Sequence, residues 1–154
     1  MNAFVPTGGP TPPTDIPVGN NPWYPPLSTA EFAAQTGLGH QYPPERLAAE
    51  LAIAAIDANS ILASWRSRQT ADSLADIPAA IYGGVSEKVL LYKRTVHALA
   101  RARLTTVVRD YDTTGKGDKR ADALDRTVEG WFQSAQEALA RLTERASVVT
   151  VELI

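Results

Sequence analysis

The most constraining feature of this chain is a break in composition at Pro44. Residues 1–44 hold ten of the eleven prolines, five of the ten glycines, and no lysine or arginine. Proline lacks the backbone N–H that helices and central strands require, and glycine weakens both kinds of element. We therefore expect residues 1–44 to form an extended, proline-rich arm.

Apolar side chains nevertheless recur along this arm, and a simple spacer would not need them. They predict that the arm becomes ordered by lying on the chain's own helices or on a neighbouring subunit; they are Phe4, Ile16, Val18, Trp23, Tyr24 and Leu27. A flexible tail is the alternative for residues 1–15. Ser28 and Glu31 form a helix-capping pattern, and Gly37 and Gly39 would end that helix. A short helix is thus predicted near residues 28–36.

Three long amphipathic patterns follow the arm. The first reaches from Pro44 to about Arg68, and its apolar stripe consists of Leu47, Leu51, Ala54, Ala58, Ile61 and Trp65. After a connector at 70–85, the second runs from residue 87 to about 111, and the third runs from Asp118 to about 143. The predicted fold class is all-α: an antiparallel helical bundle of three long helices plus one short helix, whose domain covers residues 45–145.

The last residues, 146–154, differ from the helical patterns before them. Their β-branched and apolar side chains predict a strand, made of Val148, Val149, Thr150, Val151, Glu152, Leu153 and Ile154. The sequence offers no second strand of comparable strength, and a lone strand leaves its backbone groups unpaired. We favour strand addition to a partner protein. Pairing with the arm, around Phe4-Val5 or Ile16-Pro17-Val18, is the alternative.

The residue types that catalysis or metal binding needs do not come together in the sequence. Cysteine is absent, and His40 and His97 lie far apart without partners at ligand spacing. Residues 110–118 resemble a calcium loop, but its twelfth position, which should be a bidentate glutamate, is Ala121. Gly115-Lys116 lacks the Ser or Thr of a phosphate-binding loop. We predict a protein that is not an enzyme and has no cofactor or metal.

Charge is unevenly distributed along the chain. Nine basic residues lie from Lys88 to Arg120, opposed by three aspartates, whereas the whole chain carries a net charge of −2. In a ring of copies, the helix predicted over residues 87–111 could line a DNA channel by phosphate contacts alone; the candidate residues are Lys93, Arg94, Arg101 and Arg103. For a single helix, a solvated face paired with nearby acids is the safer interpretation; those acids include Asp122, Asp125 and Glu129.

One segment carries a family resemblance. Gly115–Asp122, followed by Leu124-Asp125 and Trp131, resembles the signature region of the phage head completion protein (gpL) family. The motif residues are Gly117, Asp118, Lys119, Ala121, Asp122 and Trp131. Leu74–Pro78 and the pair Lys88 and Tyr92 match further parts of the family pattern.

The resemblance implies a structural virion protein, a head–tail connector of contractile-tailed phages. Such an adaptor would dock on the portal protein after DNA packaging and form a ring of identical subunits, expected to be twelve-fold. The ring would close the neck, receive a tail-side neck or tail terminator protein, and surround genomic DNA without sequence specificity. It would assemble in the host cytoplasm, without a membrane. The alternatives are a helical adaptor that forms no ring and a weak, non-specific DNA-binding protein.

Overall fold

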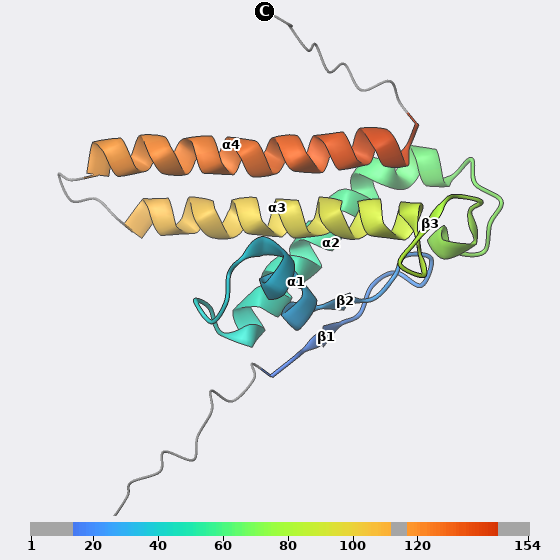
Figure 1. Ribbon diagram of the computed structural model, residues 1–154, viewed down its shortest axis with the longest axis horizontal. Coiled ribbons are helices and arrows are strands. Elements are labelled where there is room, and N and C mark those ends of the chain that lie inside the picture. Colours follow the sequence, from blue (N-terminus) through green and yellow to red (C-terminus); the bar gives the residue numbers. More distant parts are fainter. Residues whose placement is uncertain (1–13, 112–116, 145–154) are drawn as a thin grey trace, which may run out of the picture.

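The fold is mostly helical, as a computed structural model shows (Figure 1). It describes residues 14–111 and 117–144, and the side chains of 14–107 and 127–144. The helices are α1 (Thr29–Thr36), α2 (Pro44–Arg66), α3 (Glu87–Tyr111) and α4 (Gly117–Leu142), with a 3₁₀ turn at Leu74–Asp76. Two short antiparallel pairs complete the described elements: β1 (Pro17–Val18) with β2 (Leu27–Ser28), and β3 (Ile81–Tyr82) with β4 (Val85–Ser86).

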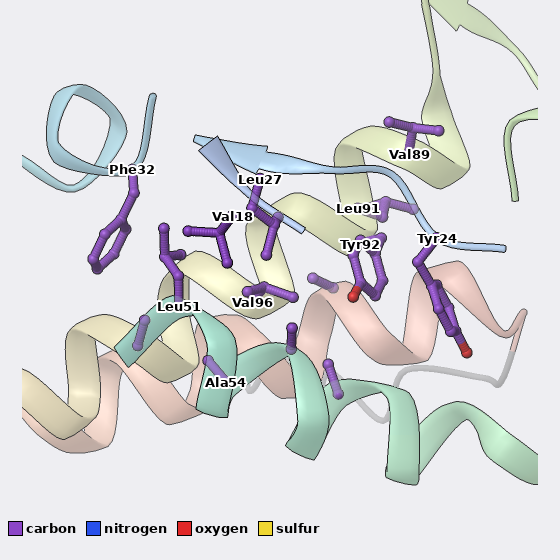
Figure 2. Close-up of a cluster of buried hydrophobic side chains, with 14 of the residues drawn as sticks. Val18, Tyr24, Leu27, Phe32, Leu51, Ala54, Val89, Leu91, Tyr92 and Val96 are labelled. Carbon is purple, nitrogen blue, oxygen red and sulfur yellow. The ribbon is translucent and has the colours of Figure 1, made fainter. Parts of the chain in front are cut away.

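The predicted all-α bundle of three long helices is wrong. The described part of the chain contains four helices and, in addition, two small two-stranded sheets. Helices α3 and α4 lie side by side and antiparallel, whereas α2 passes obliquely behind α3 (Figure 1). The physical reason is that the arm, and not a third aligned helix, fills much of the space beside α2 and α3. Val18 and Leu27 point from the β1–β2 pair toward these two helices (Figure 2).

The short helix α1 begins and ends at the residues that the sequence indicates. The Ser28 hydroxyl accepts a hydrogen bond from the Glu31 N–H at 3.1 Å, and Gly37 ends the helix at φ 67°. Asp15 adds a second cap, since its carboxylate accepts from the Ala30 N–H at 3.1 Å and the Ser28 hydroxyl at 2.9 Å. These hydrogen bonds, first the one from Ala30 and then the one from Ser28, lower the pKa of Asp15.

The apolar stripe of α2 departs from the prediction at its C-terminal end. Ile61 is 59 % exposed, and its neighbour Leu62 is fully buried in its place. At 3.6 residues per turn, Ile61 lies about 40° to one side of Leu47 around the helix, at the edge of the buried face. Trp65, which returns to the line of Leu47, is buried as predicted.

Side chains of the arm bind the two core helices through aromatic and polar contacts. The Tyr24 ring stacks on Tyr92 at 4.8 Å, as Figure 2 shows for these two residues. The Tyr92 hydroxyl donates to Asn59 Oδ1 and accepts from Asn20 Nδ2, both at 2.8 Å. Asn59 Nδ2 donates back to Asn20 Oδ1 at 3.0 Å, which closes a three-membered network. The described part of the arm, residues 14–44, thus lies on the chain's own helices.

Replacing Tyr92 by Phe should lower the free energy of unfolding by about 1–2 kcal/mol, because two half-buried amides lose their shared partner. Burial raises the pKa of this tyrosine to about 12, so its hydroxyl keeps the proton that it donates to Asn59 at neutral pH. Chemical denaturation of the variant and the parent measures the difference. An unchanged midpoint would mean that the network contributes nothing to stability.

Candidate assembly surfaces

A buried lysine joins the start of α3 to the end of α4. Lys88 is 5 % exposed, and its Nζ donates to the Leu142 carbonyl at 2.7 Å and to Glu144 Oε1 at 2.8 Å. A cation at this position satisfies a free carbonyl of the last turn and complements the negative end of the helix dipole. The hydrogen bond and the charge of Lys88 lower the pKa of Glu144. Residue 144, from which the C-terminal segment continues, is therefore fixed beside α3.

Replacing Lys88 by Met should destabilise the fold by roughly 2 kcal/mol, since the Leu142 carbonyl would lose its charged donor in a buried site. Glu144→Gln is the matched control, because the Glu144 side chain is 80 % exposed and its ion pair is screened by water. Thermal unfolding of both variants measures the effect. Equal losses in the two variants would assign the stability to the ion pair and not to the helix end.

The β3–β4 hairpin presents an exposed apolar surface at this same end of the molecule (Figure 1). Its two-residue loop, Gly83-Gly84, has φ angles of 56° and 79°. These match a type I′ turn, which glycine adopts most readily. The large side chains around the loop are exposed by 37–64 %; they are Ile81, Tyr82, Val85 and, on the first turn of α3, Leu90. We call these four residues the hairpin surface.

The hairpin lies in the segment that the sequence predicts to be a connector, residues 70–85. The available signal was the Gly-Gly pair between β-branched and aromatic residues, which is typical of a tight hairpin. The strands have only two residues each, so the alternation of a longer strand is absent.

A second exposed apolar surface lies on α2. Ile53 and Ile56 are exposed by 39 % and 63 %, on the side of the helix that faces away from the core. We call these two residues the isoleucine ridge; Ile61, which is 59 % exposed, lies about 140° from Ile56 around the helix. Length and composition alone would allow α2 to cross a membrane, a property that it shares with core helices. In this fold its other face packs on α3, and the ridge suits a protein contact.

The four candidate DNA-lining residues are held by contacts within the chain. Lys93 pairs with Glu31 at 2.8 Å, and Arg103 pairs with Glu50 at 3.2 Å and Asp57 at 3.4 Å. Each of the other two contacts α4: Arg94 donates to Ser134 at 3.2 Å, and Arg101 lies over the Trp131 ring at 6.0 Å. The acids of α1 and α2 that take part were not among the partners predicted from the sequence. A DNA-lining role for these four residues stays a prediction.

His97 is buried on α3, where its contacts give it a structural role and do not place it for acid–base chemistry. Its Nδ1 lies 2.8 Å from Gln35 Oε1, and its ring packs near Phe32. Its Nε2 has no hydrogen-bond partner among the described residues. Burial lowers the pKa of His97 to about 4; the charge of Lys93 also lowers it, and that of Glu31 raises it. The neutral form therefore prevails near pH 7.

The structure does not describe the side chains of two predicted sets of residues, one in full and one in part. The strand residues Val148–Ile154 lie outside the described residues, as do the side chains of the family motif from Gly117 to Asp122. Of that motif, Trp131 is described, and it is half-buried on α4 beneath Arg101. Within the described ranges, no group of three or more His, Cys, Asp or Glu side chains is placed to share a metal ion.

Comparison with known proteins gives a consistent result. The family described as phage head completion protein (GPL) matches residues 18–154. A head completion/stabilization protein of Escherichia phage P2 is 30 % identical over 148 residues, which cover 94 % of this chain and 88 % of the relative. No solved structure matches significantly. The family resemblance predicted from residues 115–131 is thereby confirmed, and the chain belongs to the phage head completion protein family.

Proposed function

We propose that this chain is a structural subunit of the head–tail joint, which docks on the portal after DNA packaging and forms a ring there. The proposal rests on the family and on the P2 relative, whose name describes head completion and stabilization. The observation that carries it is the hairpin surface, in which the cross-strand partners Tyr82 and Val85 share one face of the β3–β4 hairpin and are 59 % and 37 % exposed next to the start of α3. Exposed apolar clusters of this kind mark protein contacts.

The end of the molecule where the hairpin surface and the C-terminal end of α4 lie, which we call the docking end, combines two elements. Lys88 holds Glu144 beside the start of α3, two residues after the hairpin ends. A strand formed by residues 148–154 would therefore begin close to the hairpin surface. Strand addition to a portal sheet would pair its backbone groups, while the hairpin surface would supply apolar contact. The two elements together would engage the portal.

Ring formation requires two different surfaces on each copy, because head-to-tail contacts join unlike patches. Because the hairpin surface is assigned to the portal, the isoleucine ridge would supply one of these two ring surfaces. Twelve copies, matching the portal, would close the neck and present the opposite end to the tail-side protein. The same contacts would place the protein in the virion neck.

Co-sedimentation with the cognate portal ring tests the docking end. Tyr82 is 59 % exposed, so Tyr82→Ser should leave the fold unchanged and weaken portal binding roughly tenfold or more, as truncation of an interface aromatic does. The matched control is Phe132→Ser, which removes an aromatic 42 % exposed on α4, about 15 Å along the helix from its C-terminus. Equal binding by the Tyr82 variant and the parent would exclude the hairpin surface from docking.

A further inference from the structure

An uncharged groove lies where the described chain begins. Its volume is about 630 Å³, and it is formed by one face of α1, the loop that follows α1, and the first turn of α2. Thr14, the first described residue, is itself part of the lining. The lining contains no Asp, Glu, Lys or Arg; its apolar part consists of Ala30, Ala33, Tyr42, Pro43, Pro44 and Leu47.

The sequence directly before Thr14 has three parts. Phe4-Val5-Pro6 is apolar, Gly8-Gly9 can adopt almost any backbone direction, and Pro10–Pro13 contains three prolines. Residues 1–13 carry no charged side chain, as the groove carries none. An apolar, proline-containing segment is the kind of ligand that an aromatic- and proline-lined groove accepts. Its chemistry therefore matches that of the groove.

The prolines next to Thr14 bear on whose groove the segment reaches. Thr11 and Pro12 each precede a proline, which favours extended conformations. In a polyproline helix, a sequence such as Pro10–Pro13 would span about 12 Å and would carry the residues before it beyond the rim of its own groove. Gly8-Gly9 then allows a change of direction. This order, a stiff spacer, a hinge and an apolar end, favours reaching a second molecule.

We propose that Phe4-Val5-Pro6 of one copy occupies the groove between α1 and the start of α2 of a second copy. The proposal rests on the proposed ring, in which each copy would pass its arm to the next. Head-to-tail exchange uses two unlike surfaces per copy, the arm and the groove, and it closes when the ring closes. Arg46 lies over one face of the Tyr42 ring, 5.7 Å from its centroid, so Pro6 would lie against the other face, and Phe4 would fill the part of the groove beside Leu47.

Disulfide trapping tests this exchange, because the chain has no cysteine of its own. Phe4→Cys and His40→Cys are prepared as separate full-length proteins, mixed at high concentration with and without the cognate portal, and oxidised. His40 is exposed on the groove lining, and Ala75→Cys, exposed on the 3₁₀ turn, is the matched control. We expect at least tenfold more mixed dimer with the His40 variant than with the Ala75 variant.

Two outcomes would overturn the proposal. One is no excess of mixed dimer over the control in either condition. The other is an intrachain disulfide in a Phe4→Cys/His40→Cys double variant at high dilution, with no mixed dimer, which would place the arm in its own groove. Portal co-sedimentation of the same proteins separates the two proposals: intact portal binding without cross-linking rejects arm exchange alone. Cross-linking without portal binding rejects portal docking alone.

Discussion

Deleting residues 148–154 should abolish binding to the cognate portal ring and leave the helical content of the protein unchanged. The fold should survive because α4 ends at Leu142, before the deletion, and Lys88 holds that end in place. Binding should fail because main-chain hydrogen bonds supply most of the affinity in strand addition. Co-sedimentation and circular dichroism of the truncated protein give both readouts.

A pair of point variants separates strand pairing from simple loss of apolar residues. Thr150→Pro removes a backbone N–H in the middle of the expected strand, whereas Thr150→Ala keeps it. We expect the proline variant to bind the portal much more weakly than the alanine variant, which should behave as the parent does. If the truncated protein still docks, strand addition is the wrong mechanism, whatever the point variants do.

The free energy of unfolding should fall by roughly 3 kcal/mol between pH 6.5 and pH 4, because His97 is buried in its neutral form. Burial lowers its pKa from 6.5 to about 4. Below pH 6.5 the unfolded chain binds a proton at this residue and the folded chain does not, so stability decreases as the pH falls. The decrease should level off near pH 4, where the folded chain also binds the proton. Urea denaturation at a series of pH values measures this profile.

His97→Gln is the control for the pH profile, since glutamine can keep a polar contact with Gln35 and does not titrate in this range. The variant should be less stable at pH 7 and should show a flatter profile between pH 6.5 and 4.5. Asp15 and Glu144, whose pKa values are lowered by hydrogen bonds, lose their contributions as the pH falls through the ordinary carboxyl values of 3.8 and 4.5, so these losses begin at the acidic edge of the profile. A variant profile as steep as that of the parent would assign the titration to another group.

The elements with local signals could be predicted from the sequence. Ser28 and Gly37 delimit α1 through their own backbone preferences, and the apolar spacing placed α3 and α4 to within about a residue. The family was identified from one motif, because its residues are specific in combination.

The remaining features depend on how distant segments meet. The oblique crossing of α2 follows from the arm residues, such as Val18 and Leu27, that pack against it, and no periodicity in α2 records them. The partners of Lys93 and Arg103 come from α1 and α2, which only the folded chain brings near. The β3–β4 hairpin was missed because two-residue strands show no alternation, although Gly83-Gly84 indicated the turn.

Electron cryomicroscopy of the purified protein mixed with its cognate portal tests the central claim most directly. The proposed function predicts a ring of density on the portal, with the hairpin surface against it and residues 148–154 paired with a portal strand. A chain that stays unbound, or a ring whose hairpin surface points away from the portal into solvent, would contradict it.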